Sequence, residues 1–195
     1  CESCIESFQI ATDVAVSGET IAEKAECIFM QAGCEWEDWR GSVLVDWARE
    51  FHSIVKEIRP DALVGNFQAA WKDEDFWGAR RRCLGLDFNA LAPYVDVFSP
   101  MPYHGRSGML PEYVREYVEY FSSSYHVYTD PDRYPRLWPI VQAFDSPRVE
   151  PEELESILEY GLAKQSSGVI AFTIDSIIAD PGKITAIKKV FTEKR

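Results

Sequence analysis

Hydrophobic and polar positions form a repeated pattern along the last two thirds of the chain. Four apolar runs, each ending in a turn or a polar residue, occupy residues 62–67, 95–103, 137–144 and 169–175. Their ends lie 36, 41 and 31 residues apart, and each gap contains a helix-like stretch. This spacing is typical of repeated strand–helix units that build a parallel sheet, and it predicts an α/β fold. In such a sheet, functional side chains are expected where the strands end.

Helices are predicted where apolar residues recur three and four positions apart. The clearest one covers residues 42–58 and carries Val43, Trp47, Phe51, Ile54 and Ile58 on one face. Proline, joined at the second site by acidic residues, marks the starts of two more helices, at residues 111 and 151, because these residue types suit a helix N-terminus. We also expect helical stretches at residues 21–30, 73–82 and 87–91 and from residue 182.

The N-terminal third differs from the rest of the chain. Residues 1–41 contain four of the five cysteines and no apolar run of the strand type. The chain of 195 residues is 46% hydrophobic, which is ordinary for a folded globular domain. We therefore interpret residues 1–195 as a single domain, in which a cysteine-containing segment, 1–41, precedes four strand–helix units, 42–195.

The charge balance argues against two classes of partner. Twenty Lys and Arg residues against 32 Asp and Glu residues give a formal net charge of −12, which repels phosphate backbones and anionic membrane surfaces. No apolar stretch approaches the roughly 20 residues that span a bilayer, and the first residues form no signal-peptide pattern. We expect a soluble protein that binds neither nucleic acid nor membranes.

The five cysteines leave the redox state open. An odd number of cysteines in a chain of this size slightly favours a reducing compartment such as the cytoplasm. A structural zinc site would need paired thiolates, but six residues separate Cys27 from Cys34, whereas two separate Cys1 from Cys4. Free thiols fit this spacing best, with a disulfide and a zinc site as alternatives. We predict no metal and no other cofactor.

The repeated units are compatible with two architectures. Because crossovers between parallel strands are right-handed, four successive units form either an open doubly wound sheet or part of a closed (β/α)8 barrel. A nucleotide-binding open sheet would carry a glycine-rich phosphate loop, and neither G-x-G-x-x-G nor G-x-x-x-x-G-K-S/T occurs in the chain. The sequence therefore favours the (β/α)8 barrel type, with an open four-stranded α/β domain as the alternative.

The ends of the apolar runs carry aromatic, amide and carboxylate side chains. Sugars present C–H faces that stack on aromatic rings and hydroxyl groups that bond to amides and carboxylates, so this mixture favours a carbohydrate ligand. The predicted substrate-binding residues are Asn66, Trp71, Tyr103, His104 and Gln142. Gln68 and Phe144 lie in the same positions at the ends of runs.

Three segments that overlap the apolar runs resemble strands of a known protein family. Residues 95–104 (VDVFSPMPYH), 138–144 (WPIVQAF) and 167–172 (SGVIAF) resemble strands six, seven and eight of glycoside-hydrolase-like (β/α)8, or TIM, barrels. Near the N-terminus, the C-x-x-C-x-x-x-F segment formed by Cys1, Cys4 and Phe8 is similar to the segment that follows strand four in such proteins, and Trp39-Arg40 before a long helix also matches. The resemblance covers nearly the whole chain and implies the C-terminal half of a barrel, strands five to eight.

The resemblance implies a glycoside hydrolase that cleaves O-glycosidic bonds. A key strand-four acid of such barrels would fall before Cys1, and Gln142 occupies the strand-seven position where many retaining enzymes carry a glutamate. The catalytic candidates within the chain are Asp145 and Asp175. A pair of catalytic carboxylates would lie about 5–5.5 Å apart in a retaining enzyme or about 6.5–9.5 Å apart in an inverting one.

Each of these residues also has a structural interpretation. Asp145 and Asp175 can cap turns, and Gln142 can belong to an internal hydrogen-bond network. The alternative function is therefore a carbohydrate-binding or purely structural barrel relative without hydrolytic chemistry. Half a barrel would also expose two sheet edges and an apolar face. We accordingly expect it to pair with a second copy or with a separately encoded N-terminal half.

Overall fold

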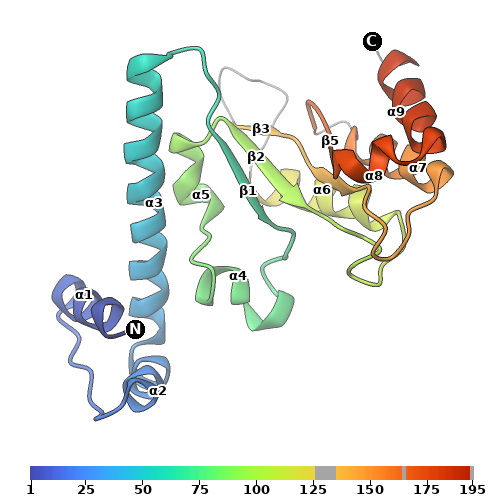
Figure 1. Cartoon of the computed structure of the whole chain (residues 1–195). Coiled ribbons are helices and arrows are strands. Elements are labelled where there is room, and N and C mark those ends of the chain that lie inside the picture. The colour runs from blue at the N-terminus through green and yellow to red at the C-terminus, as the bar shows by residue number, and fades with distance from the viewer. Residues whose placement is uncertain (126–134, 164–165, 194–195) are drawn as a thin grey trace. The chain divides into compact units, whose positions relative to one another are not determined.

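The computed structural model describes residues 1–125, 135–163 and 166–193 (Figure 1). The chain divides into two compact units: unit 1 is Cys1–Pro60 with Trp71–Tyr94, and unit 2 is Asp61–Ala70 with Val95–Arg195. In the described residues, unit 1 is helical and unit 2 contains every strand. The interpretation of residues 1–195 as a single domain stays a prediction.

Unit 1 is built on three longer helices, followed by a series of short ones. Helix α2 starts with a capping box, in which the Thr20 hydroxyl accepts a bond from the Glu23 amide and the Glu23 carboxylate accepts one from the Thr20 amide. Helix α3 begins nine residues earlier than predicted, and α1 was not predicted at all. The bounds are α1 (Glu2–Thr12), α2 (Ile21–Gln31), α3 (Gly33–Ile58), α4 (Ala79–Arg82) and α5 (Phe88–Leu91), with short 3₁₀ turns η1 (Asp75–Trp77) and η2 (Ala92–Tyr94).

The first three helices enclose a small core. Ile5 and Phe8 of α1 pack with Ile28 of α2, and the tryptophans of α3 close the cluster. The Phe8 ring meets Trp36 and Trp39 edge-on, with ring centroids 5.2 and 5.6 Å apart. Burial of one such aromatic side chain contributes about 1.5–3 kcal/mol to stability. The packing of this cluster therefore stabilises the three helices against one another.

The long helix α3 has an exposed apolar stripe. The exposed fractions of its side chains range from 40% for Val43 to 76% for Trp47. The apolar stripe comprises the residues predicted to share one face of the helix, Val43, Trp47, Phe51, Ile54 and Ile58. The same helix carries nine charged residues, from Glu35 to Glu57. Within residues 1–125, 135–163 and 166–193, no helix combines the length and the apolar character required to cross a bilayer.

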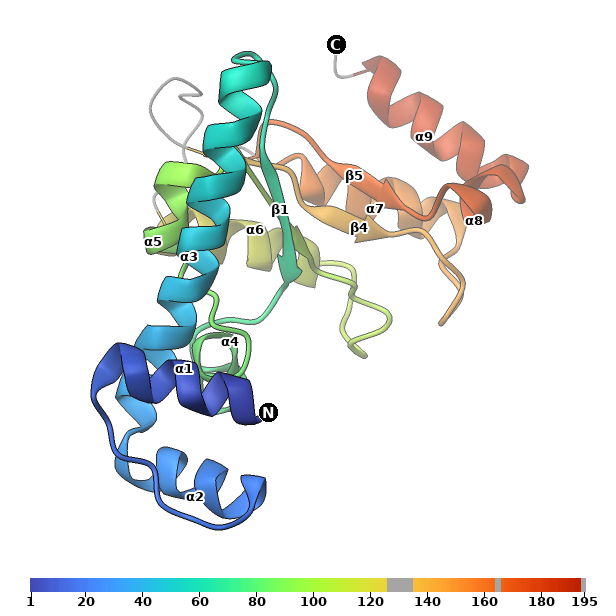
Figure 2. The ribbon, with the colours of Figure 1, turned by 60° about the vertical axis from the view of Figure 1, so that its left-hand side comes forward.

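Unit 2 contains short strands that all pair in parallel, as the spacing of the apolar runs predicted. The first three strands are ordered β1 (Gly65–Ala69), β2 (Val97–Met101) and β3 (Arg136–Leu137), and β4 (Ile140–Gln142) pairs with β5 (Ile170–Phe172). Figure 2 shows β4 and β5 side by side. The structure thus confirms an α/β fold with parallel strands, and the described residues do not close a complete barrel.

A two-residue interruption separates β3 from β4. The Trp138 amide donates to the Phe98 carbonyl of β2 at 2.9 Å, and the Pro139 carbonyl accepts from the Ile170 amide at 2.9 Å. Proline has no amide to donate, which explains the break in the strand ladder. The segment from Arg136 to Gln142 therefore pairs first with β2 and then with β5, so that the four predicted runs follow one another in spatial order.

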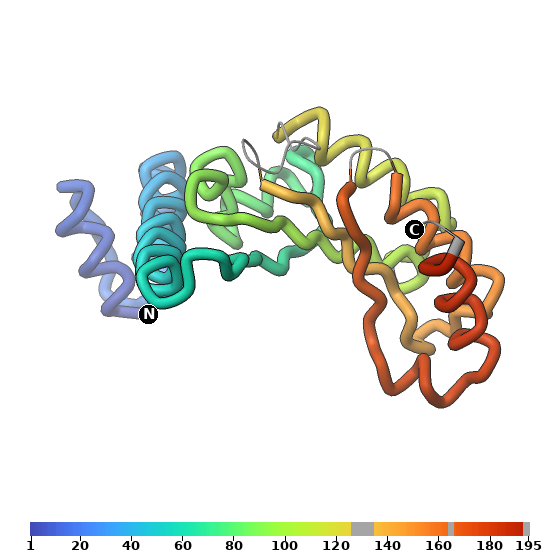
Figure 3. The backbone as a smooth tube through the Cα atoms, turned by 90° about the horizontal axis from the view of Figure 1, so that it is seen from above, coloured from blue at the N-terminus to red at the C-terminus, as the bar shows by residue number. Residues whose placement is uncertain are grey.

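Helices cover one face of the strands. They are α6 (Tyr113–Ser124), α7 (Pro151–Gly161), α8 (Ile174–Ile178) and α9 (Pro181–Glu193), and Figure 3 shows α6 and α7 outside the strand layer. Phe98 of β2 packs against Phe121 of α6, with ring centroids 5.6 Å apart. Val141 of β4 belongs to a buried cluster with Leu154 and Leu158 of α7.

The opposite face of the strands exposes an aromatic side chain on each of the edge strands β1 and β5. Successive side chains point to opposite faces of a strand. Asn66, which precedes Phe67, is paired with the helix-facing Phe98, so Phe67 lies on the face away from α6, where its side chain is 68% exposed. Phe172 lies on that face of β5. Among the described residues, β1 pairs only with β2 and β5 only with β4, so each keeps one edge without a strand neighbour.

Candidate functional site

Three aromatic rings meet where β2, β4 and β5 end. Tyr103 follows β2, Phe144 follows β4 and Phe172 is the last residue of β5. The Tyr103 centroid lies 5.2 Å from Phe144 in an edge-on arrangement and 6.2 Å from Phe172 in a stacked one, and the two phenylalanines are 6.3 Å apart. We call these three residues the aromatic cluster. Phe172 is 49% exposed, so part of the cluster is available to a ligand.

The hydroxyl of Tyr103 adds a polar group to the cluster. Partial burial raises the pKa of Tyr103 above its ordinary value, and the positive charge of Arg106 opposes this increase. The hydroxyl therefore stays protonated at neutral pH and can donate a hydrogen bond. An aromatic face and a hydroxyl donor are groups that can contact the C–H face and the oxygen atoms of a sugar ring.

Gln142 connects the two loops that carry Tyr103 and Phe144. Its Oε1 accepts a bond from the Arg106 amide at 3.0 Å, and its Nε2 donates to the carbonyls of Phe144 at 3.3 Å and Pro147 at 3.1 Å. A Cβ on Gly105 would lie 3.3 Å from both amide atoms of Gln142, so the absence of a side chain there permits this close approach. The buried amide is occupied by protein groups, and its contact with a substrate stays a prediction.

His104 lies on the helix side of its loop, although it follows Tyr103 directly. The side chain is buried, and its Nε2 lies 2.7 Å from Oε1 of Glu153 in the first turn of α7. Oε2 of the same glutamate accepts a bond from the Glu150 amide at 3.4 Å. His104 thus anchors the loop after β2 to α7, while the predicted role in substrate binding stays untested.

Asp145 forms an ion pair with a buried lysine of α9. Lys183 is 0% exposed, and its Nζ donates to Oδ1 of Asp145 at 2.6 Å and to the Ala143 carbonyl at 2.9 Å. The Val149 amide also donates to Oδ1 of Asp145, at 3.3 Å. The hydrogen bond from Lys183 is the main reason that the pKa of Asp145 lies below its ordinary value. Asp145 is therefore ionised at neutral pH.

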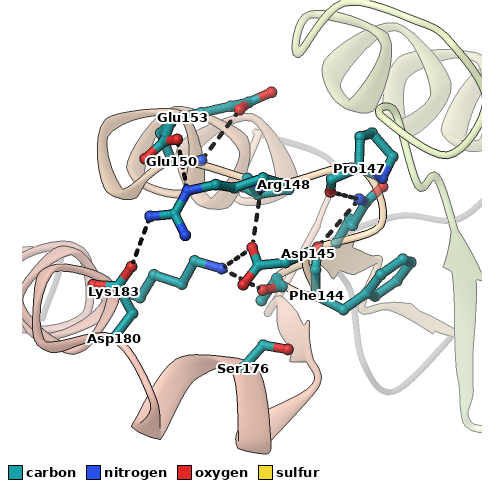
Figure 4. Close-up of polar contacts among 12 residues, drawn as sticks. Phe144, Asp145, Pro147, Arg148, Glu150, Glu153, Ser176, Asp180 and Lys183 are labelled. Atoms are coloured by element: carbon teal, nitrogen blue, oxygen red, sulfur yellow. Dashed lines mark hydrogen bonds and ion pairs between the residues drawn. The ribbon is translucent and has the colours of Figure 1, made fainter.

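The direction of the Asp145 side chain differs from that of its neighbour. In Figure 4 the carboxylate points toward Lys183, whereas the Phe144 ring extends to the other side. Arg148, three residues later, contacts Glu150 at 2.7 Å and Asp180 at 3.4 Å. The loop after β4 is thus fixed to α7 and α9 by charged contacts, and these contacts set the position of Phe144 at its start.

Asp175, the second predicted catalytic residue, lies in the first turn of α8, three residues after Phe172. Its side chain is exposed. In the parts of the chain that the structure describes, no hydrogen bond or ion pair engages its carboxylate. It is therefore a freely accessible carboxylate close in sequence to the aromatic cluster.

The two remaining predicted residues lie elsewhere. Asn66 is on β1, paired with Phe98, and its position alternates with that of the exposed residue Phe67. Its Oδ1 is buried without a hydrogen-bond partner among the described residues, and so are both amide atoms of Gln68. Trp71 belongs to unit 1, where its ring packs edge-on against Phe76 with centroids 5.1 Å apart. Their contacts with a substrate stay predictions.

The described residues also define what the chain offers to a metal. In residues 1–125, 135–163 and 166–193, no group of three or more His, Cys, Asp or Glu side chains is placed to hold an ion. The expectation that no cofactor is needed stays a prediction.

Comparison with known proteins gives a structural likeness. The chain is similar to the solved structure of the PgaB (BpsB) glycoside hydrolase domain from Bordetella bronchiseptica, with a TM-score of 0.71 and 14% sequence identity. The likeness shows the fold. It covers 97% of this chain and 51% of that one, so the chain spans about half the length of the domain it matches. No family model and no curated protein matches the sequence.

Proposed function

We propose that this chain forms strands five to eight of a glycoside-hydrolase-type (β/α)8 barrel and that its aromatic cluster binds a saccharide. In this assignment β1 is strand five, β2 is strand six, β3 with β4 is strand seven and β5 is strand eight. The observation that carries the proposal is the meeting of Tyr103, Phe144 and Phe172 at the carboxyl ends of three neighbouring strands, where barrel enzymes place their sites. The fold likeness to a glycoside hydrolase domain supports it.

The exposed part of Phe172 stacks on the C–H face of a sugar ring, and the Tyr103 hydroxyl donates to a sugar oxygen. The test is isothermal titration with a panel of neutral, acidic and amino-sugar oligosaccharides. For an oligosaccharide that binds, Phe172→Ala is expected to weaken binding at least about tenfold, or about 1.4 kcal/mol.

The matched control is Phe191→Ala on α9, because Phe191 is 43% exposed and lies outside the aromatic cluster. It is expected to bind like the wild-type protein. Binding by Phe172→Ala at wild-type affinity, or an equal loss in Phe191→Ala, would contradict the assignment of the site.

Hydrolysis is the finer part of the proposal and assigns roles to two carboxylates. Asp175 is exposed and follows Phe172 of the aromatic cluster by three residues, and Asp145 is ionised at neutral pH. An ionised carboxylate can act as a nucleophile or base, which is the role assigned to Asp145. The other role, proton donation to the leaving group, is assigned to Asp175. Release of reducing ends from a bound oligosaccharide is the assay, and Asp175→Asn is expected to abolish release while binding persists.

A specific observation favours the second candidate function, a carbohydrate-binding barrel without hydrolysis. The Asp145 carboxylate points toward Lys183, and the strand-seven residue Gln142 cannot ionise. Binding of an oligosaccharide by the wild-type protein with no release of reducing ends, at any pH between 4 and 9, would support this function over hydrolysis.

The exposed surfaces of each unit support the proposal that the barrel is completed by further strands, from a second copy or from an N-terminal half outside residues 1–195. Among the residues that the structure describes in unit 2, β1 and β5 each keep an edge without a strand neighbour, and Phe67 is exposed. In unit 1, the apolar stripe of α3 is exposed. Light scattering coupled to size-exclusion chromatography tests self-pairing: twice the 22.3 kDa mass of the chain supports a second copy. A stable monomer that binds no hydrophobic dye would contradict both forms of completion.

A further inference from the structure

Two thiols face each other at the start of α1, in unit 1. Cys1 is the N-cap residue of this helix, and the Cys4 amide donates to the Cys1 carbonyl at 3.1 Å. The two sulfur atoms lie 3.1 Å apart, and both side chains are exposed. The C-x-x-C spacing therefore places both thiols on the same side of the first helical turn, accessible to a reagent in solution.

The arrangement needs little change to become a disulfide. An S–S bond is about 2.05 Å long, and it joins residues whose Cα atoms are about 4.4–6.8 Å apart; residues three apart in a helix fall within that window. The sulfur atoms have to approach by only about 1 Å relative to their present separation. The core of this unit uses Ile5 and Phe8 of the same helix, so the change leaves the packed residues in place.

We propose that Cys1 and Cys4 form a reversible dithiol–disulfide pair that exchanges with small disulfides of the glutathione type. One cysteine thiolate attacks a sulfur of the oxidant, whose S–S bond breaks and releases one thiol. The second cysteine then attacks the protein sulfur of the mixed disulfide and releases the second thiol. The protein loses two electrons and two protons, and the oxidant gains both. The inference concerns unit 1 alone and is independent of the saccharide proposal.

The position of the pair indicates a labile disulfide. A disulfide stabilises a protein mainly by closing a loop in the unfolded chain, and the gain rises with loop length. The Cys1–Cys4 loop contains only two intervening residues, so the stabilisation is small. Exposed disulfides of this kind are more easily reduced than the buried structural ones. The pair is therefore expected to change state within the range of glutathione redox buffers.

Tryptic peptides provide a direct test in the wild-type protein. The tryptic peptide that ends at Lys24 contains Cys1 and Cys4, whereas the next one, residues 25–40, contains Cys27 and Cys34. The protein is equilibrated with reduced and oxidised glutathione at a series of ratios, alkylated, digested and analysed by mass spectrometry. The first peptide is expected to convert to the form that lacks two hydrogen atoms and takes up no alkylating agent.

The second peptide is an internal control. In the structure, the Cys27 sulfur contacts the Ser17 hydroxyl at 3.4 Å, which lowers the pKa of the Cys27 thiol. Cys27 is thus a reactive thiol without a facing cysteine. It is expected to form a mixed disulfide with glutathione and no disulfide within its peptide. Equal formation of internal disulfides in both peptides would overturn the proposal, because pairing would then not depend on the Cys1–Cys4 geometry.

Two substitutions complete the test. Cys4→Ser is expected to trap Cys1 as a mixed disulfide with glutathione, since the second attack is lost, whereas Cys34→Ser is expected to leave the midpoint ratio of the first peptide unchanged. A first peptide that stays fully alkylated at every ratio that modifies Cys27 would also overturn the proposal. So would protection of both thiols that a chelator such as EDTA removes, because it would indicate a bound metal.

Discussion

Replacement of Asp145 by asparagine tests whether the ion pair with Lys183 holds α9 on the strands. The substitution keeps the size of the side chain and removes its charge. Lys183 is 0% exposed, and among the described residues its Nζ donates hydrogen bonds to Asp145 and to the Ala143 carbonyl. Asp145→Asn therefore leaves a buried ammonium group with a carbonyl and an amide oxygen but without a counter-charge.

The structure sets the size of the effect. Breaking a fully buried ion pair by removing one partner costs about 3–5 kcal/mol. The Asp145 side chain is 39% exposed, so water screens the pair, and we expect a loss of about 2 kcal/mol. Lys183→Met removes the buried charge itself and leaves Asp145 to water and the Val149 amide. Its expected cost is about 1 kcal/mol, mainly from the Ala143 carbonyl that loses its donor.

Urea denaturation at pH 7 measures both substitutions, together with the double substitution. For a chain of this size, about 2 kcal/mol corresponds to a melting temperature about 4–8 °C lower. The double variant is expected to resemble Lys183→Met, because no buried charge remains to be left alone. If Lys183→Met destabilises the protein more than Asp145→Asn does, the buried ammonium is not the source of the cost and the reasoning is refuted.

The same pair predicts a pH dependence. Because the pKa of Asp145 is lower in the folded protein than in the unfolded chain, its contribution to stability is present above the unfolded pKa, about 3.9, and is lost as the pH falls through the folded value. The difference in unfolding free energy between the wild-type protein and Asp145→Asn is expected to be constant above about pH 5 and to decrease below about pH 4. A difference that grows with acidity would contradict the sign.

Three further predictions concern packing, the loops and the exposed stripe. Leu154→Ala in the buried face of α7 is expected to cost about 3–4 kcal/mol in urea denaturation, whereas Leu110→Ala, at an exposed position, is expected to change stability by less than about 0.5 kcal/mol. Gln142→Met removes the acceptor of the Arg106 amide, so hydrogen exchange at that amide is expected to become faster, while equal exchange would contradict the assigned contact. Trp47→Lys on the apolar stripe is expected to reduce binding of a hydrophobic dye without changing stability by more than about 0.5 kcal/mol.

The strand–helix order was predictable from local patterns. The residues of α6 and α7 that face the strands repeat three and four positions apart, and the strands fall within the four apolar runs. Such regularity arises because each element buries one face against its neighbours. The early start of α3 was missed because its first turns, with Glu35, Glu37 and Asp38, have no continuous apolar face. Helix α1 was missed because only Ile5 and Phe8 bury side chains in it.

The candidate site was predictable by location, and less so by orientation. Tyr103 and Phe144 were recognised because they are the last residues of apolar runs, and both belong to the aromatic cluster. Phe172 was missed because its run was extended to Asp175, although the strand ends at Phe172 and α8 begins at Ile174. The direction of His104 and Gln142 depends on partners far away in sequence, such as Glu153 and Arg106. A pattern of residue types does not contain that information.

Lys183 illustrates the same limit. Its neighbours Ile184, Ile187 and Val190 form the inward face of α9, and a lysine beside such a face is usually taken for a solvent-exposed residue. Its burial follows from the carboxylate of Asp145, 38 residues earlier. A single lysine next to an apolar helix face, with an aspartate shortly after a strand, is thus a signal for an internal ion pair. It gains meaning only once the helix is known to pack against that strand end.

The polar residues at the strand ends have a common effect on the aromatic cluster. Gln142 bonds the backbone on both sides of the cluster, at Arg106 and Phe144, and Lys183 holds the Ala143 carbonyl next to Phe144. His104, the residue after Tyr103, contacts Glu153 and so fixes this loop to α7. Because the backbone near two of the three rings is held by buried hydrogen bonds, the rings are pre-organised, and a ligand pays little conformational entropy to order them. If the aromatic cluster binds a saccharide as proposed, substitutions of these polar residues are expected to weaken binding through the position of the rings, whereas substitution of Phe172 removes the ring proposed to contact the ligand.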